Sequence, residues 1–327
     1  MTKFKGFDLS ERPYKTRNFT CRGCPNVCRI TEVRFLGEPP FYYGSRCGRF
    51  DERLKDEGKL PDLFRRRSEI IFDRDGKGVS LAGPLRFAPH GRPRGRTGIP
   101  RALLMWELFP FFCAFFRTLG YEVVLSPETS QELVRTSLAG APPTECLPAK
   151  VACGHVEALL DEGVDILFIP ALIDAAHPNT RTKTNYNCPL VQAQPYMLAS
   201  GFDFPSLGVE AIIVPLHFYQ EELIRKELLS LARRLGGSQR QAERALEAAR
   251  EAERTAREGL LTLGKEALEL VSGGETGIVI LSRLYNGCDW GLNLGVPEKL
   301  RALGALPIPI DCLPWDCLLY TSPSPRD

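Results

Sequence analysis

The sequence predicts an α/β protein in which a parallel-sheet domain follows a short cysteine-rich module. From residue 97 onward, short apolar segments alternate with longer segments of helical periodicity, which is the pattern of a parallel sheet covered by helices. Residues 1–60 lack that periodicity and contain four cysteines among Gly and Pro turns. Residues 219–273 are helical in pattern throughout. With 327 residues, the chain is long enough for two ordinary domains with hydrophobic cores.

Changes in composition predict the domain boundaries. We expect a Cys-rich metal-binding module over 1–60, a basic linker or loop over 61–96, a first α/β domain over 97–218, a helical hairpin over 219–273, the start of a second α/β domain over 274–316 and an artefact over 317–327. The last segment has the sequence of a translated sequencing adapter. We therefore expect the natural protein to continue beyond Asp316.

The first α/β domain is expected to alternate strands with helices. Its strands are one that ends near 98–100 and others over 121–125, 165–170 and 211–215. Pro110 suits the first turn of a helix, because its missing N–H is not needed there. Ser130 suits the N-cap of a second helix, to about residue 138, and a third helix is expected over 148–162.

The C-terminal part is expected to begin with two helices and then return to strands. A break at Gly236 and Gly237, followed by the capping residue Ser238, divides the helical hairpin. Strands are expected over 277–281 and 306–310, with a turn at 286–287.

Composition is that of a soluble globular protein, with 43% apolar and 25% charged residues. The longest apolar stretch, 102–116, is interrupted by Glu107 and Pro110, so a buried helix is expected rather than a membrane span. No export signal opens the sequence, and a cytoplasmic location is expected. Eleven cysteines in such a protein are expected to be metal ligands or reactive thiols, because the cytosol keeps thiols reduced.

Charge is distributed unevenly along the chain. Residues 1–100 hold 22 Lys and Arg against 12 Asp and Glu, a balance of +10, which leaves −8 for the remainder. Such asymmetry is typical of proteins that bind nucleic acid or an acidic partner, although a solvated basic face explains it equally well.

The strongest chemical pattern is a set of four cysteines near the N-terminus: Cys21, Cys24, Cys28 and Cys47. The x2 gap between Cys21 and Cys24 allows two sulfurs to meet on one turn, and four thiolates complete a tetrahedral zinc site or a [4Fe-4S] cluster. Spacing alone does not distinguish zinc from iron–sulfur. The alternative is that these are buried, unligated thiols.

A second, sparser set contains Cys146 and Cys188. Cys146 stands at the head of a predicted helix, where free N–H groups stabilise a thiolate, and Cys188 follows a strand in a loop rich in Asn and Thr. Such loops carry the sites of α/β proteins. Cys153 is seven residues after Cys146, about 10 Å away on a helix, which is too far for a compact cluster. Cys153, Cys113 and Cys288 are therefore expected to be ordinary buried thiols.

Lys150 and His155 are the candidate catalytic residues of the first α/β domain. Lys150 lies one turn beyond Cys146 and could bind an anion or simply face solvent. His155 could act as a base or ligand, but a packed, hydrogen-bonded role is favoured for a single His on a helix beside Gly154. Neither a P-loop nor a G-x-G-x-x-G motif is present, so the sequence gives no support for nucleotide binding.

Four short motifs in combination resemble a known family. They are Gly98-Ile-Pro-Arg-Ala-Leu, Glu107 followed by Leu-Phe-Pro-Phe-Phe, Cys146-Leu-Pro-Ala-Lys with Gly154-His155, and Asn187-Cys188-Pro189. The chain resembles the acyl-CoA dehydratase activase-related proteins, also called CoA-substrate-specific enzyme activases, which are related to the 2-hydroxyacyl-CoA dehydratases. The resemblance covers nearly all of residues 8–316.

This resemblance implies an iron–sulfur protein of anaerobic metabolism with flavodoxin-like or Rossmann-like domains. It implies that Cys146 and Cys188 are ligands of a [4Fe-4S] cluster, with a third ligand from a C-terminal domain. It also implies an ATP-hydrolysing activator as partner and acyl-CoA as the substrate class. The sequence departs from the family at Ser282-Arg-Leu-Tyr, where Gly-Arg-Pro-Tyr is expected, and at Cys288.

Three functions are compatible with these observations. The leading hypothesis is low-potential electron transfer or radical acyl-CoA dehydration by an iron–sulfur protein. The second is a zinc-knuckle module on an α/β scaffold that contacts nucleic acid or an acidic protein, which leaves Cys146 and Cys188 unexplained. The third, a metal-free CoA- or acyl-binding domain, leaves all the cysteines unexplained.

Overall fold

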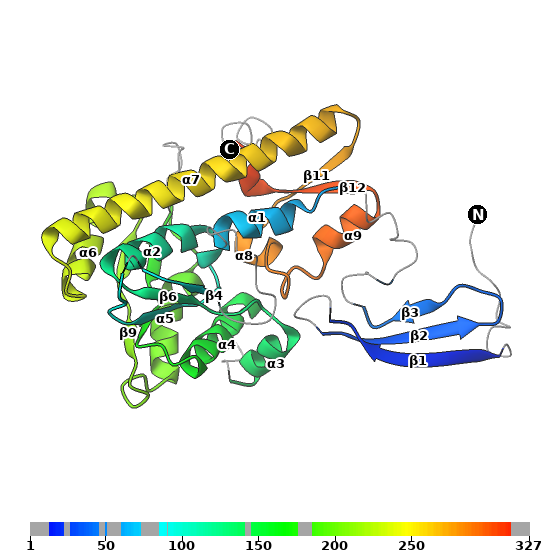
Figure 1. Cartoon of the computed structure of the whole chain (residues 1–327), viewed down its shortest axis with the longest axis horizontal. Helices are drawn as coiled ribbons and strands as arrows, with labels where there is room; N and C mark the ends of the chain where they lie inside the picture. The colour runs from blue at the N-terminus through cyan, green and yellow to red at the C-terminus, as the bar shows by residue number, and fades with distance from the viewer. Residues whose placement is uncertain are drawn as a thin grey trace.

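A five-stranded sheet forms the centre of the larger part of the chain. The computed structural model describes residues 13–22, 27–45, 50, 60–72, 85–89, 91–140, 145–175 and 185–314. The sheet contains, in spatial order, β4 (Leu85–Phe87), β6 (Glu122–Leu125), β5 (Arg96–Ile99), β7 (Ile166–Phe168) and β9 (Glu210–Ile212) (Figure 1). Neighbouring strands are parallel, except that the edge strand β4 pairs antiparallel with β6. The predicted α/β class with a parallel sheet is confirmed.

The strand order reverses between β5 and β7. The chain passes from β5 to β6 on one side, and then returns to place β7 on the other side of β5. In open α/β sheets, the crevice outside the carboxyl ends of the strands at such a reversal is where ligands bind. The loops after β5 and β7 therefore lie at the expected site edge of the sheet.

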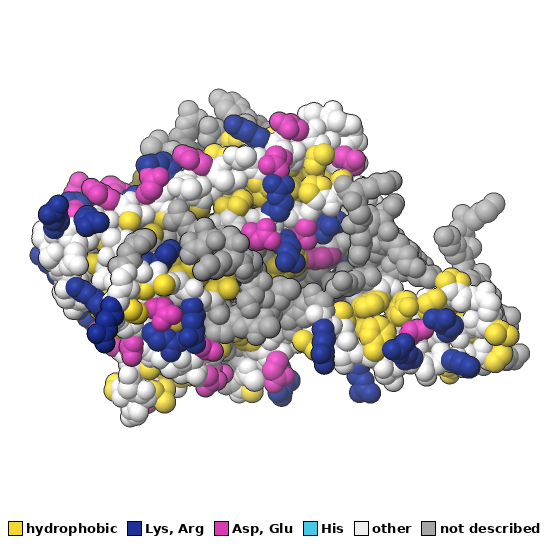
Figure 2. Space-filling view, in the orientation of Figure 1, with side chains coloured by type: hydrophobic (Ala, Val, Ile, Leu, Met, Phe, Trp, Pro, Cys, Tyr) yellow, Lys and Arg dark blue, Asp and Glu magenta, His cyan; other side chains and the backbone are white. Residues whose placement is uncertain are grey.

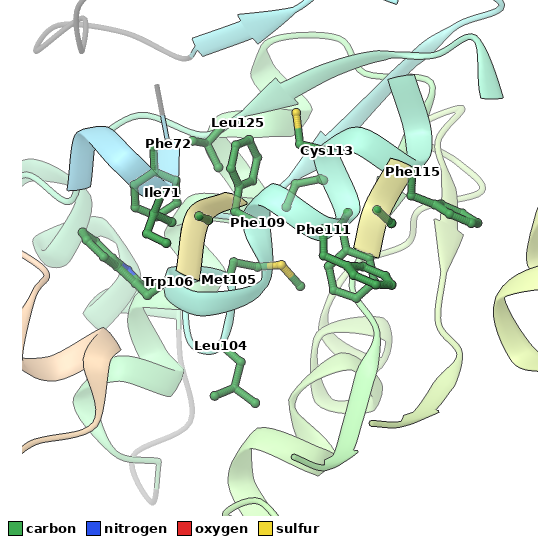
Figure 3. Packing of buried hydrophobic residues seen from close by; sticks show 14 of the residues in the cluster. Ile71, Phe72, Leu104, Met105, Trp106, Phe109, Phe111, Cys113, Phe115 and Leu125 are labelled. Atoms are coloured by element: carbon green, nitrogen blue, oxygen red, sulfur yellow. The ribbon is translucent and has the colours of Figure 1, made fainter. Parts of the chain in front are cut away.

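Helices cover both faces of this sheet. They are α2 (Met105–Leu119), α3 (Gln131–Gly140), α4 (Leu147–Asp161) and α5 (Pro189–Gly201). Side chains alternate between faces along β6: Val123 packs in the cluster with α2, whereas Val124 packs in the cluster with α4. The aromatic side chains of α2 dominate the first cluster, as Figure 3 shows for Phe109, Phe111 and Phe115.

The helical hairpin predicted from composition consists of α6 (Glu221–Arg234) and α7 (Gln239–Ser272). Ser238 forms a capping box with Gln241 at the start of α7, which confirms the predicted cap. In Figure 1, α7 lies lengthwise over α2 and α1, with which it is in contact. The hairpin therefore covers the core instead of projecting from it.

Two predicted strands differ from the observed elements. The segment 211–215 is shared between β9 and β10 (Pro215–His217). β10 leaves the main sheet and pairs in parallel with β8 (Ala171–Asp174). The predicted strand over 165–170 ends at Phe168 in the structure, before Pro170, which has no N–H for a sheet hydrogen bond.

Pro110 is predicted from the sequence to lie in the first turn of a helix, but α2 begins five residues earlier, at Met105. Pro110 has no N–H to bond the carbonyl of Trp106 four residues back. That carbonyl instead accepts a 2.7 Å hydrogen bond from Arg67. A tertiary contact thus replaces the helical bond that the proline removes.

The segment predicted as a basic linker contains regular structure. It holds α1 (Leu63–Phe72) and strand β4. The apolar face of α1 is buried against α2 and α7, and Phe72 packs edge-on against Trp106 at 4.9 Å between ring centroids. The basic composition suggested a linker, but the segment contains an amphipathic helix whose arginines lie mostly on the exposed side.

The second α/β unit has two parallel strands, β11 (Thr276–Ile280) and β12 (Ala305–Pro309). Between them lie α8 (Leu284–Gly287) and α9 (Val296–Ala302), and the short helix η3 (Ile310–Cys312) follows β12. The residues expected to form a turn at 286–287 are the end of α8.

The N-terminal segment forms a separate antiparallel sheet of β1 (Tyr14–Thr20), β2 (Arg29–Phe35) and β3 (Phe41–Tyr43), seen beside the main body in Figure 1. Its aromatic side chains pack on one another, as in the pair Phe19 and Tyr42. Within the described parts of the chain, none of the helices has the length and hydrophobicity that crossing a membrane requires.

Candidate functional site

Cys146 and Cys188 occupy equivalent positions at the N-termini of two helices. Cys146 is the N-cap of α4 and Cys188 is the N-cap of α5, each followed within two residues by a proline in the first turn. Neither thiol is in a disulfide; Cys146 is exposed and Cys188 is partly buried. The N–H groups of a helix N-terminus favour negative charge, so both positions suit thiolates.

The loop before Cys188 is anchored to strand β8. The buried side chain of Asn187 donates to the carbonyl of Leu172 at 3.0 Å, and its backbone N–H donates to Ile173 at 2.9 Å. The side chain of Gln192 in turn donates to the Asn187 carbonyl at 2.7 Å. These bonds hold the start of α5 at the same edge of the protein as the loop after β7.

Tyr285 of α8 lies within electrostatic range of both cysteines. Burial raises the pKa of its hydroxyl most, Arg283 opposes that rise, and negative charge at Cys188 or Cys146 adds to it. The second unit thus contributes one buried hydroxyl within electrostatic range of two thiols from the first α/β domain.

Glu107 adds an ionisable group beside Arg283. Its pKa is raised to about 7 by desolvation, with Arg67 and Arg283 acting against the rise and Asp311 adding to it. The side chain as a whole is exposed, so water reaches the carboxyl and moderates this rise.

Gln194 connects the second turn of α5 to the first turn of α4, close to Glu145. The amide of Gln194 donates to the carbonyl of Ala149 at 3.1 Å, and its nearness lowers the pKa of the Glu145 carboxyl. Glu145 is buried, which raises its pKa, while the charge of Lys150 and the side chain of Gln194 oppose the rise. The candidate Lys150 thus lies beside a buried carboxylate next to Cys146.

His155 lies inside the protein with both ring nitrogens bonded. Ser126 is 2.9 Å from Nδ1 and Thr129 is 3.0 Å from Nε2. Burial and the charge of Arg101 lower the pKa of the ring to about 3, so it is neutral at physiological pH. This is the packed, hydrogen-bonded role that its sequence context favours. Gly154 allows the close approach of α3, since a Cβ there would overlap the Ser137 hydroxyl.

The other thiols of the α/β part lie away from solvent. Cys113, Cys288 and Cys312 are buried, and Cys153 is partly buried. Burial raises the pKa of Cys153 to about 11 and that of Cys288 to about 12. Cys113 and Cys288 are buried thiols, as predicted, whereas Cys153 is only partly buried.

Of the four N-terminal cysteines, the structure places two. Cys21 and Cys28 follow the β1–β2 register, and the N–H of Cys21 donates to the carbonyl of Cys28 at 2.8 Å. Directly opposed residues of an antiparallel pair have Cβ atoms about 4.5–5.5 Å apart. Cys24 and Cys47 lie outside the described residues.

Val27, just before Cys28, has a φ of 43°, a strained value for a β-branched residue.

A metal site is not confirmed by this geometry. In the part of the chain that the structure describes, no three His, Cys, Asp or Glu side chains are arranged to hold a metal ion. The donor chemistry nevertheless fits iron or zinc, since Cys146 with Cys188 and Cys21 with Cys28 each supply a pair of thiols.

Sequence reasoning did not identify Glu145, Tyr285, Arg67 or Asp289. Glu145 adjoins Cys146 directly, and Arg67 stands on the apolar face of an amphipathic helix, so both were accessible signals. Tyr285 stands in the Ser282-Arg-Leu-Tyr motif that the sequence singles out, although no role was assigned to it. Asp289 has no local signal, because its significance comes from a contact with Thr129, far away in the chain.

No curated protein and no solved structure matches the chain. Residues 96–313, which extend from β5 to the residue after η3 and include Cys146, Cys188 and Tyr285, match the CoA enzyme activase uncharacterised domain (DUF2229). The match covers more than half of the chain, which therefore belongs to this CoA enzyme activase-related family.

Proposed function

We propose that this chain is an iron–sulfur protein of a CoA enzyme activase system, in which Cys146 and Cys188 are thiolate ligands of a [4Fe-4S] cluster. The observation that carries the proposal is that the two cysteines occupy equivalent N-cap positions on α4 and α5, two helices in contact, and that both lie within electrostatic range of Tyr285. The cluster would supply one-electron chemistry at low potential. The further ligands would come from residues outside the described part or from a partner.

The surrounding residues support a charged redox centre. Arg283 is close enough to Tyr285 and Glu107 to influence both, and its charge offsets part of the negative charge of a thiolate-ligated cluster. The N–H groups at the starts of α4 and α5 act in the same direction.

The proposed partners are an ATP-hydrolysing activator and a dehydratase-type enzyme with an acyl-CoA substrate. The family name supports a role in activating a CoA enzyme. Lys and Arg side chains stand out on the N-terminal sheet in Figure 2, and Lys15, Arg17 and Arg34 are exposed there. Such a surface suits an acidic protein partner.

The test is anaerobic reconstitution of the full chain with iron and sulfide, followed by measurement of bound iron, acid-labile sulfide, zinc and visible absorbance. The Cys146→Ser/Cys188→Ser double variant is expected to lose the cluster-derived absorbance that depends on this site. Cys153→Ser, on the same helix, is the matched control and is expected to retain it. Equal iron and sulfide in the double variant and the wild type would contradict the assignment.

A zinc-binding module at the N-terminus is the second candidate function. The pairing of Cys21 with Cys28 and the strained backbone at Val27 favour a metal-stabilised turn there. Zinc without iron, together with salt-sensitive retention on DNA, would support a nucleic-acid-binding role. Zinc lost in Cys21→Ser/Cys28→Ser, with iron unaffected, would place the two metals in separate sites.

A further inference from the structure

The edge of β11 that does not face β12 is open to solvent. Four of the five residues of β11 are exposed, although three of the five are aliphatic. Gly277 is among the exposed ones, and since it has no side chain, the surface that it exposes is the backbone itself. Within the described part of the chain, only β12 pairs with β11, and no backbone hydrogen bond joins its other edge to another segment. This edge therefore offers unpaired N–H and C=O groups to a further strand.

A parallel strand with one open edge is unusual in this protein and in general. β5, the first parallel strand of the main sheet, has parallel partners on both sides, whereas β11 has only β12 beside it (Figure 1). Parallel strands are normally covered, and a sheet of two strands is marginally stable. Of the 18 large hydrophobic side chains that are exposed among the described residues, eight lie within 268–303, around β11. Such a concentration marks an interaction surface.

The sequence around β11 is complementary to itself when two copies run in opposite directions. If Val279 faces Val279 of a second copy, the residues at equal distances on either side also face each other. These facing pairs are Ile278 with Ile280, Gly277 with Leu281, Thr276 with Ser282 and Glu275 with Arg283. The series contains two aliphatic side chains, a leucine beside a glycine that leaves it room, two hydroxyls and two opposite charges. Facing pairs of these kinds stabilise antiparallel strands.

We propose that β11 pairs in antiparallel orientation with β11 of a second copy of this chain, around a two-fold axis at Val279. The two small sheets then form one sheet of four strands, in the order β12, β11, β11, β12. Such a dimer uses the same surface on both copies and gives hydrogen-bond partners to the open edge of each. The opposite charges of Glu275 and Arg283 meet twice, once on each side of the axis. The dimer requires no metal ion, so it is independent of the cluster assignment.

The mass of the full chain in solution tests the dimer. Size-exclusion chromatography with light scattering, over a series of concentrations, under reducing conditions and without added iron, is expected to give twice the chain mass of 36.5 kDa. Val279→Lys places two like charges at the axis and is expected to give the mass of the monomer. Leu207→Lys, at an exposed leucine outside the second unit, is the matched control and is expected to remain dimeric. A monomeric wild type would overturn the proposal.

Exchange of the charged pair tests the register. Glu275→Arg and Arg283→Glu each bring like charges together twice in the dimer, and each is expected to weaken association about fivefold. The double variant Glu275→Arg/Arg283→Glu is expected to recover the association of the wild type, because opposite charges face each other again. Circular dichroism checks that every variant is folded, and Val279→Lys serves if a charge variant is not. A dimer that survives Val279→Lys, or a folded double variant that does not recover, would show that another surface joins the copies.

Discussion

Thr129 donates a 2.6 Å hydrogen bond to the buried carboxylate of Asp289, and this bond joins the first α/β domain to the second unit. Thr129 follows β6, and Asp289 follows α8, which carries Tyr285. The bond continues through His155 to Ser126. Because His155 lies on α4 and Asp289 follows α8, the network ties the helix that Cys146 caps to the second unit.

Loss of the Thr129 hydroxyl is expected to destabilise the protein. Thr129→Val keeps the shape but leaves one oxygen of Asp289 and one nitrogen of His155 without a partner in a buried place, which costs about 1–3 kcal/mol. Urea denaturation followed by circular dichroism measures the change. Thr136→Val, at an exposed position on α3, is the control and is expected to change stability by less than about 0.5 kcal/mol. Similar losses in both variants would show that the buried network is not responsible.

The buried carboxylate of Asp289 is expected to make the stability of the folded protein depend on pH. Desolvation raises the pKa of Asp289 from 3.8 to about 7, against the opposing effects of Thr129 and Gly291. The folded state therefore holds this proton more tightly than the unfolded state, and the associated stability is lost as pH rises from about 4 through about 7. A tenfold difference in proton affinity between the folded and unfolded states corresponds to about 1.4 kcal/mol of stability.

Asp289→Asn removes this titration, so the stability of wild type relative to the variant is expected to fall across the interval from pH 4 to pH 7. Other groups also make stability depend on pH, among them His155 and carboxyls whose pKa is raised, such as Glu298. Their effects are present in both the wild type and Asp289→Asn, so they cancel when the two stability curves are compared. Parallel stability curves for the two proteins would contradict the assignment.

Arg67 and Asp311 form a buried ion pair that connects α1 to the end of the second unit, with a distance of 2.9 Å between Nη2 and the carboxylate. Arg67→Met is expected to cost about 3–5 kcal/mol, because Asp311 is left buried without its partner. The double variant Arg67→Met/Asp311→Leu is expected to recover much of that loss. Arg65→Met, at a half-exposed position on the same helix, provides the control in the same denaturation assay.

Thiol reactivity is expected to divide the cysteines into two groups. Cys146 is exposed, whereas Cys113, Cys288 and Cys312 are buried and react only when the protein opens. Alkylation by iodoacetamide, followed by mass spectrometry, is expected to modify Cys146 at least about 100-fold faster than the buried group. Reconstitution with iron and sulfide is expected to protect Cys146 and Cys188. Unchanged labelling of Cys146 after cluster formation would argue against its role as a ligand.

Gly264 allows α7 to cross η3 in close contact. A Cβ at this position would overlap the backbone carbonyl of Cys312, which cannot move as a flexible side chain can. Gly264→Ala is expected to destabilise by about 1–3 kcal/mol through overpacking, despite the better helix propensity of Ala. Gly201→Ala, where the added Cβ meets nothing within 4 Å, is the matched control and is expected to be neutral or stabilising. Thermal unfolding distinguishes the two outcomes.

The sequence was sufficient for the features that local patterns determine. Apolar periodicity predicted the alternation of strands and helices, Ser238 predicted the start of α7, and Cys146 was predicted to stand at the head of a helix. Each of these signals depends on interactions between residues a few positions apart, and such interactions can be inferred directly from the sequence. The helix α5, which begins after Cys188, was not predicted.

Tertiary structure decided what depends on residues far apart in the chain. Only packing shows that Arg67 takes the carbonyl that Pro110 leaves free, that Tyr285 lies within electrostatic range of Cys146 and Cys188, and that Asp289 bonds Thr129 from 160 positions away. The physical reason is that burial changes the properties of a side chain: the same His or Asp is charged or neutral, free or bonded, according to which distant groups exclude water from it.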